Sequence, residues 1–433
     1  MNELIQDSKV TSFVEFLPKT KLPFNNELLL KASDVLKSID FPTTRTEAWK
    51  YTRLGRIAAI PTREQIARAG KNLSREFINA NFQISNNGLT FVFENGIFRS
   101  DLSSGEFPKG ATIKPLTGCT KEELATVGQS ISLENELFNS MNTVYAIDGM
   151  SIVIEDKTII EEPIQFIHLL TGKNTVANLR NFIHIGKFAK AEIMQSFFAL
   201  DAENSFANSI TEINVSENAH LIVNKLQCEA EGNFHVSTEQ VDQAKDATFT
   251  INTLTLDGTL VRNNLNISVN GVNATTNLNG AYILNKQQHV DNHTCVDHRA
   301  PHCNSNELYK GVIDDKATAV FNGKVFVRKD AQKINAFQSN ANVLLSDFST
   351  VNSKPELEIY ADDVKCSHGS TTGQLDEEAV FYLRARGISD RSARNLMVEA
   401  FIGQVLEKIE NEALLKFTQE KLNKRFNWES IVE

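Results

Sequence analysis

The stretch that decides the fold carries two copies of one pattern, Asp246-Ala247-Thr248-Phe249-Thr250-Ile251 and Asn273-Ala274-Thr275-Thr276-Asn277-Leu278. Each copy is a polar residue and an alanine followed by a strand-like run. Two earlier copies, Lys190-Ala191 and Asn218-Ala219, bring the intervals to 28, 28 and 27 residues. A fifth member, Lys316-Ala317, follows after a longer gap that we interpret as an insertion. A repeat of this length predicts stacked coils whose turn residues line up along one edge.

The residues around the repeat have the composition of short strands. Between residues 148 and 360 there are only three prolines, and Asn, Thr, Val and Ile are abundant. Runs such as Ile210-Thr211-Glu212-Ile213-Asn214-Val215 and Asn264-Leu265-Asn266-Ile267-Ser268-Val269 alternate with period two, which places one set of side chains inward and the other outward. One coil cannot bury its inner face alone, so coils stack around a shared apolar column. The sequence predicts a mainly β protein with a right-handed parallel β-helix core; a β-sandwich is the alternative.

This core is predicted to span residues 148–372, after an N-terminal helical and α+β region at residues 1–147. In that first region, Asn26 to Ile39 has helical spacing and is ended by Pro42, because the residue before a proline is pushed out of the helical conformation. Leu89-Thr90-Phe91-Val92-Phe93 reads as a strand closed by Asn95-Gly96.

A C-terminal helical region is predicted at residues 373–433. One helix begins with the acids of Asp376 to Glu378 and ends at Gly387, and Ser389 or Asp390 caps the next. That second helix has one apolar stripe, made of Ala393, Leu396, Met397, Ala400, Phe401, Val405 and Ile409. The stripe is expected either to cap the end of the β column or to dock a partner.

The bulk composition excludes several classes of protein. A chain of 433 residues with a net charge of −10 is not typical of a protein whose main partner is nucleic acid or an anionic membrane. No apolar run reaches the length of a membrane span, and the first residues do not read as a signal peptide. The five cysteines are odd in number and widely spaced, which argues against a disulfide framework. We expect a cytoplasmic protein.

Two groups of side chains could hold a metal. The first lies between His289 and Cys303 and contains His293, Cys295, His298 and His302. Its spacing matches no closed zinc pattern, and ordinary structural roles are favoured; a zinc protein using the His293–Cys303 region remains an alternative. The second is Cys366-Ser367-His368, where positions two apart on a strand point the same way. That pair could form half of a metal site that another subunit completes.

Signatures of catalysis are missing from the sequence. There is no Walker A loop, no G-x-S-x-G turn and no H-E-x-x-H helix. A β-helix enzyme acting on carbohydrate would need grouped carboxylates, and Asp314-Asp315 and Asp362-Asp363 are the nearest candidates. Acidic pairs on turns are more often solvated than catalytic. We therefore expect no enzyme activity in this chain alone, with a carbohydrate-active β-helix enzyme as the alternative.

Four stretches together resemble one family. They are Arg45-Thr46-Glu47-Ala48-Trp49-Lys50-Tyr51-Thr52, His289-Val290-Asp291-Asn292-His293-Thr294, the run from Pro301 to Gly311, and the run from Glu356 to Glu378. The resemblance is to the SufB/SufD family of iron–sulfur cluster assembly proteins and covers almost the whole chain. It implies a parallel β-helix scaffold that is part of a SufBCD complex, with SufB, a paralogous β-helix protein, and SufC, an ABC-type ATPase, as partners.

The same resemblance implies where the function lies. In this family the C-terminal helices dock SufC, and the β-helix end pairs with the paralogue at a junction where a transient iron–sulfur cluster forms. A histidine matching His368 is implicated there, as a metal ligand shared with the partner subunit; Cys366 is its neighbour and a weaker candidate. The resemblance implies no cofactor tightly bound to the isolated chain. Binding of a flavin by the complex, and a homodimer of the isolated chain, are left open.

Differences within the family favour its SufD branch. SufB has glutamates on either side of this histidine, where the present chain has Ser367 and Gly369. The cysteine on which SufB builds clusters corresponds to Ala341. These differences argue against independent cluster assembly by this chain.

Overall fold

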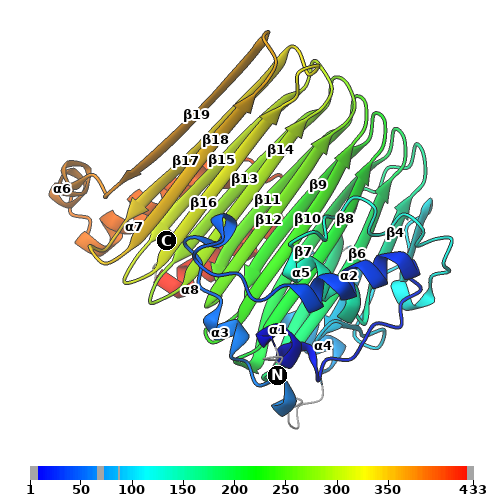
Figure 1. The fold of residues 1–433 in the computed structure, drawn as a ribbon. Helices are drawn as coiled ribbons and strands as arrows, with labels where there is room; N and C mark the ends of the chain where they lie inside the picture. The colour runs from blue at the N-terminus through cyan, green and yellow to red at the C-terminus, as the bar shows by residue number, and fades with distance from the viewer. Residues whose placement is uncertain (1–7, 66–72, 86–87, 427–433) are drawn as a thin grey trace, which may run out of the picture.

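The computed structural model describes residues 8–65, 73–85 and 88–426, and its centre is a parallel β-helix (Figure 1). Sheet A runs in the order β19-β17-β15-β13-β11-β9-β7-β5-β1-β2, and sheet B in the order β18-β16-β14-β12-β10-β8-β6-β4-β3. From β4 onward, consecutive strands fall in opposite sheets, so each coil contributes one strand to each. The predicted β-helix is confirmed and the β-sandwich is wrong; the right-handed sense of winding stays a prediction.

The strands of the two sheets have similar lengths along most of the coil. Sheet A contains β1 (Thr90–Glu94), β2 (Ile97–Phe98), β5 (Ile164–Lys173), β7 (Lys190–Glu203), β9 (His220–Cys228), β11 (Thr248–Asp257), β13 (Thr275–Leu284), β15 (Asn304–Ile313), β17 (Ile334–Leu344) and β19 (Val364–Gly373). Sheet B contains β3 (Ala111–Pro115), β4 (Asp148–Ile154), β6 (Val176–Ile185), β8 (Phe206–Val215), β10 (Phe234–Gln243), β12 (Leu260–Val269), β14 (His289–His298), β16 (Thr318–Val327) and β18 (Thr350–Ile359).

Neighbouring strands from β4 to β19 pair in parallel, so each residue lies beside its counterpart in the next coil. The antiparallel pairs, β1 with β2 and β3 with β4, lie at the N-terminal end of the stack. The predicted turn at Asn95-Gly96 joins β1 to β2, with positive φ at both residues as a tight hairpin turn requires.

The polar-plus-alanine repeat marks one edge of the coil. Asn218, Asp246 and Asn273 each adopt a left-handed backbone conformation with φ between 56° and 59°, which short polar side chains tolerate. The alanine that follows each of them is fully buried and belongs to the apolar core where the chain turns into sheet A. The repeat interval is therefore one coil.

Two of the five predicted members were misassigned. Lys190-Ala191 begins β7, and the turn in its coil is made by Phe188-Ala189, with φ 58° at the phenylalanine. Lys316-Ala317 precedes a strand of sheet B and so lies on the opposite edge. The predicted insertion is absent: the turn column continues at His302 and Lys333, both with positive φ. These turns require a particular backbone conformation and not one residue type. A search for a polar residue followed by alanine therefore misplaced the turn in two coils.

Side-chain burial in the strands depends on what covers the outer face of each sheet. Strand β8 is buried on both faces, because helical residues such as Phe138 pack against Phe206 and Ile210 from outside. Strand β17 instead alternates between buried and less buried residues, as a strand covered on its inner face alone should. The alternation predicted from sequence therefore becomes clear only toward the C-terminal end of the stack.

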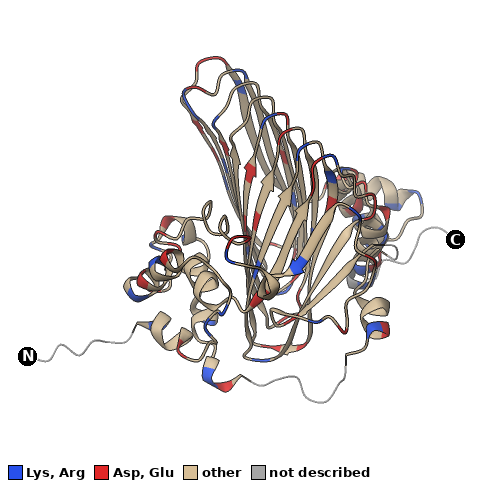
Figure 2. Cartoon of the chain, turned by 90° about the vertical axis from the view of Figure 1, so that its right-hand side faces the viewer, with Lys and Arg blue, Asp and Glu red and all other residues tan. Residues whose placement is uncertain are grey.

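Helices cover opposite sides of the coil, as Figure 2 shows. The N-terminal elements are α1 (Lys9–Val14), α2 (Asn26–Ser38), η1 (Glu47–Trp49), α3 (Gly55–Ala58), η2 (Thr62–Glu64), α4 (Arg75–Asn81), η3 (Leu116–Gly118) and α5 (Leu137–Tyr145). Of these, α5 packs on β6 and β8 of sheet B, with α2 against it. The predicted helix from Asn26 to Ile39 is confirmed as α2, which Ile39 caps.

The C-terminal helices are α6 (Glu377–Ala385), α7 (Asp390–Leu406) and α8 (Glu412–Phe426). The predicted signals are confirmed: Asp376 caps α6, Gly387 follows its end with φ 92°, and Ser389 caps α7. The predicted capping of the column is wrong, because α7 lies on the side of the coil against β13 and β15. Its buried residues include Val398, Ile402 and Val405, whereas Ala400 of the predicted apolar stripe is exposed.

Candidate functional site

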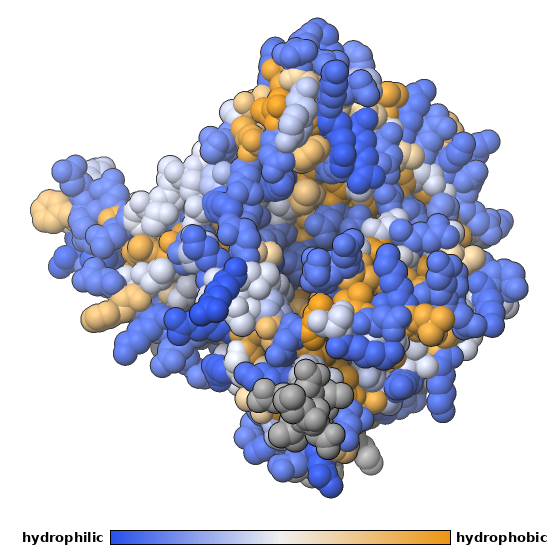
Figure 3. Space-filling model, in the orientation of Figure 1, coloured by the Kyte–Doolittle hydropathy of each residue, from blue (hydrophilic) through white to orange (hydrophobic). Residues whose placement is uncertain are grey.

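The C-terminal end of the coil leaves two strands uncovered. Strands β18 and β19 are the last strands of their sheets, and each pairs on one side only among the described residues. From Ser367 to Gly373, every residue of β19 is exposed. Figure 3 shows this strip of surface as mostly pale, because its second half is made of Gly, Ser and Thr. We call this part of the molecule the open end.

His368 and Cys366 lie at the open end on the same face of β19. Val364 and Cys366 pack against the inner core, and alternation places His368 on that inward face two residues further on. Cys366 is half-buried, whereas His368 is exposed. Burial raises the pKa of the Cys366 thiol, so the thiol stays protonated near neutral pH and is a poor metal ligand as it stands.

Beneath His368 is a column of polar side chains that the sequence reading did not single out. Glu307 of β15 pairs in register with Gln338 of β17, which pairs in register with His368. Gln338 Nε2 donates to Glu307 Oε2 at 2.7 Å, and Thr294 Oγ1 donates to Glu307 Oε1 at 2.6 Å. Burial raises the pKa of Glu307 to about 7. One feature of the sequence could have revealed this column: polar residues recur at inward positions at intervals of 31 and 30 residues.

A second polar network lies beside this column. Asn340 Nδ2 donates to Tyr282 Oη at 2.9 Å, and Ser353 Oγ donates to Asn340 Oδ1 at 2.8 Å. Ser370, exposed on β19, donates to Ser353 at 2.7 Å. Part of the interior near the open end is therefore polar and hydrogen-bonded, beside apolar residues such as Ile334 and Ala336, whereas we expected an apolar column throughout.

The histidines and cysteines between His289 and Cys303 do not converge. His293 and Cys295 share the outer face of β14, as expected, and His298 points inward to Ser305 at 2.9 Å. His302 is an exposed turn residue, while the Cys303 thiol is buried and donates to backbone carbonyls. Across residues 8–65, 73–85 and 88–426, no group of three His, Cys, Asp or Glu could hold a metal ion. This is evidence against the zinc alternative.

The carboxylate pairs also fail to form a cleft. Asp315 lies in the turn between β15 and β16, where its Oδ2 accepts a hydrogen bond from the Lys286 amide at 2.8 Å. Asp363 lies in the turn between β18 and β19, on the opposite edge, and pairs with Lys333. Acids on opposite edges cannot act on one glycosidic bond.

Two of the sequence motifs meet on the outer face of sheet B. Residues 45–52, which we call the strap, cross β12 and β14. Thr52 Oγ1 lies 2.8 Å from His289 Nε2 and donates to Asp291 Oδ2 at 2.5 Å. His293 Nε2 lies 3.0 Å from Asp291 Oδ1. Burial lowers the pKa values of both histidines, so these imidazoles are neutral hydrogen-bonding groups near pH 7.

Arg262 completes the attachment of the strap. Its Nη1 lies 2.5 Å from Asp291 Oδ2 and donates to the Ala48 carbonyl at 2.8 Å, and its guanidinium lies 4.4 Å from the centre of the Trp49 ring. Burial acts to raise the pKa of Asp291, but Arg262 and the neighbouring histidines outweigh it, and the net pKa is lowered. These motifs therefore have a structural role, which is to fix the N-terminal region to the coil.

Comparison with known proteins gives matches over both parts of the chain. Residues 168–401 match the family model described as SUF system FeS cluster assembly, SufBD core domain, and residues 11–166 match the SufBD protein N-terminal region. An iron-sulfur cluster assembly SufBD family protein of Synechocystis is 33% identical over 394 residues, covering 87% of this chain and 86% of that protein. The chain belongs to the SufB/SufD family.

Two further relatives refine the placement within the SufB/SufD family. The iron-sulfur cluster assembly protein SufD of Escherichia coli is 29% identical over 388 residues, covering 89% of each chain. Protein ABCI7, chloroplastic, of Arabidopsis thaliana is 27% identical over 430 residues, covering 95% of this chain and 87% of that protein. The similarity to a named SufD agrees with the SufD branch that Ser367, Gly369 and Ala341 favour.

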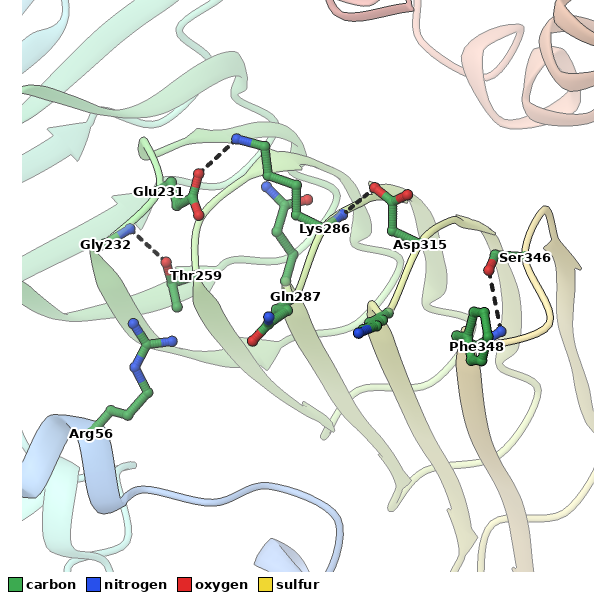
Figure 4. A pocket seen from close by; sticks show the side chains of 11 residues that line it. Arg56, Glu231, Gly232, Thr259, Lys286, Gln287, Asp315, Ser346 and Phe348 are labelled. Atoms are coloured by element: carbon green, nitrogen blue, oxygen red, sulfur yellow. Dashed lines mark hydrogen bonds and ion pairs between the residues drawn. The ribbon is translucent and has the colours of Figure 1, made fainter.

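One cavity of this SufB/SufD protein is a groove on the edge of the coil opposite the polar-plus-alanine turns, which we call the turn-edge groove. It has a volume of about 730 Å³ and is lined by residues that include Arg56, Glu231, Lys286 and Phe348 (Figure 4). Lys286 Nζ lies 2.6 Å from a Glu231 oxygen, so these opposite charges neutralise each other. The groove contains none of the residues that the family resemblance implicates.

All five cysteines of this SufB/SufD protein are free. Within the described residues, no helix is both long and apolar enough to cross a membrane.

Proposed function

We propose that this chain is the SufD-type scaffold subunit of a SufBCD complex and is not itself a catalyst. The observation that carries the proposal is His368, which is exposed on the last strand of sheet A in a SufB/SufD coil, a strand that pairs on one side only among the described residues. A strand edge offers free backbone N–H and C=O groups to a partner strand. A paralogous β-helix of the SufB type, docked at the open end, would face His368 directly.

At that junction His368 supplies one imidazole ligand to a transient iron–sulfur cluster, and SufB supplies the rest. The cluster is the cargo of the assembly and not a resident cofactor of this chain. Imidazole suits iron, and a single exposed ligand holds a cluster loosely enough for its release. Cys366 is the weaker candidate ligand. Burial raises the pKa of its thiol, and the thiol has to lose its proton before it can bind a metal.

The C-terminal helices are the proposed docking surface for the SufC ATPase. Helix α6 projects from the body of the molecule (Figure 1) and exposes Phe381 and Tyr382, at 71% and 58% of their surface. Exposed aromatic side chains are common anchors at protein interfaces. Closure of two ATP-bound SufC subunits would then pull on this side of the coil, and the hydrogen-bonded stack would carry the movement to the open end.

We place this assembly in the cytoplasm, although the name of the Arabidopsis relative describes that protein as chloroplastic. The proposal includes no tightly bound cofactor of the isolated chain. It leaves open a flavin bound by the complex and a homodimer of the isolated chain.

His368→Ala tests the proposal. The side chain is exposed, so the substitution should change the free energy of unfolding by no more than about 0.5 kcal/mol, while cluster formation in cells that depend on this chain should be lost. Thr372→Ala, on the same face of the same strand, is the matched control and should keep full activity. Both variants should still co-purify with an ABC ATPase and a paralogue. Full cluster formation by His368→Ala would refute the assigned role.

A further inference from the structure

The hydrogen bonds beneath His368 give Gln338 a defined orientation. Its Nε2 donates to Glu307 Oε2, and Thr294 holds the other Glu307 oxygen, so the carboxyl group is fixed from both sides. Because Nε2 donates to Glu307, the amide oxygen Oε1 of Gln338 points away from Glu307 and needs a hydrogen-bond donor from another residue. This oxygen is buried and has no hydrogen-bond partner in the described structure.

Gly323 on the facing strand makes room for this arrangement. It pairs in register with Thr294 and Pro355, so it lies across the coil interior from Gln338. A Cβ atom at Gly323 would overlap the Gln338 amide nitrogen and the Phe321 ring. The glycine therefore preserves a space that the Gln338 side chain fills, which is evidence that the amide position is specified by the sequence.

The next inward side chain toward the open end is His368. It pairs in register with Gln338 across the β17–β19 ladder, where adjacent strands are about 4.8 Å apart. The exposed His368 imidazole makes no hydrogen bond with the described residues, so the ring is free to rotate toward the column. A buried acceptor without a donor and a free ring with an N–H thus lie at the same position in successive coils.

We propose that Gln338 is a positioning residue for His368: its Oε1 accepts a hydrogen bond from one ring N–H, which leaves the other ring nitrogen free to bind a metal at the open end. The inference rests on the proposed role of His368 and deepens it. A histidine that binds a metal commonly donates its other N–H to a carbonyl or carboxylate oxygen, which selects one tautomer and one ring orientation. Glu307 acts one layer further down, by holding the Gln338 amide in the accepting orientation.

The test compares two substitutions at Gln338 with one at a similar glutamine. Gln338→Met keeps the size of the side chain and removes the acceptor, whereas Gln338→Glu keeps an oxygen in its place. Gln195→Met is the matched control, because Gln195 is also a buried, inward glutamine of sheet A with an unpartnered Oε1, several coils away. The readout is the ¹⁵N spectrum of the histidine rings in the full chain at pH 8, with His368→Ala assigning the signals.

In the parent chain and in Gln338→Glu, the His368 ring nitrogens should give two separate signals of a single tautomer. In Gln338→Met those signals should move toward a common average, and cluster formation in cells should fall by about 10- to 100-fold. Gln195→Met should change neither. An unchanged His368 tautomer in Gln338→Met would overturn the proposal. Because the spectrum is recorded on the isolated chain, this outcome is independent of whether His368→Ala abolishes cluster formation, which tests the proposed function instead.

Discussion

At the residue scale, one buried charge inside the coil, the Lys225 ammonium group, has several polar partners. Lys225 is buried, and its ammonium group donates to Glu239 Oε1 at 2.7 Å, to Asn263 Oδ1 at 2.9 Å and to Ser237 Oγ. These groups come from β9, β10 and β12, so they join both sheets across the interior. A buried ion pair adds little net stability over well-packed apolar side chains, but removal of one partner leaves an uncompensated charge.

Lys225→Met should therefore destabilise the fold strongly. It removes the cation and leaves the Glu239 carboxylate buried, which should lower the free energy of unfolding by about 3–5 kcal/mol. Chemical denaturation followed by circular dichroism would measure the change. Lys187→Met is the control, because Lys187 forms an exposed 3.4 Å pair with Glu217 and should cost about 0–1 kcal/mol. Similar losses in the two variants would show that the interior pair has no special role.

At the element scale, the turns show what a sequence can and cannot predict. Asn218, Asp246 and Asn273 were recognised through the polar-plus-alanine repeat, and their short polar side chains tolerate the positive φ that the turn requires. The same position in neighbouring coils is occupied by Phe188, His302 and Lys333, which residue type alone does not identify. Helix ends were predicted more closely, since Asp376, Gly387 and Ser389 each act through a local cap.

Helix α6 supports a separate prediction about the ATPase. Phe381→Asp should abolish co-purification of the ABC ATPase, because an aspartate replaces an exposed aromatic anchor, and it should leave the thermal midpoint unchanged, because that ring is 71% exposed. Phe348→Asp is the control, with a ring that is 74% exposed on the turn-edge groove. If Phe381→Asp retains the ATPase, or if both variants lose it equally, the docking surface does not include Phe381.

At the scale of the whole molecule, the proposed contact with the paralogue lies at one end of the coil, and the proposed contact with the ATPase lies on its side. Helices cover the outer faces of both sheets, and the strap fixes the N-terminal region to sheet B, so the uncovered strands lie at the open end. The exposed position of His368 on a strand could be expected from family resemblance and period-two spacing. The polar column under it was not predicted, because Glu307 and Gln338 are 31 residues apart and meet only through the coil register.

Hydrogen–deuterium exchange at the open end is the most direct test of the claim that a sister subunit docks there. Amide exchange would be compared between the isolated chain and the chain co-purified with its paralogue, over residues 350–359 and 364–373. We predict that both strands become protected in the complex, with the largest change in β19, while the turn-edge groove near Lys286 exchanges as before. Unchanged exchange in β18 and β19, together with protection of another face, would contradict a junction at His368.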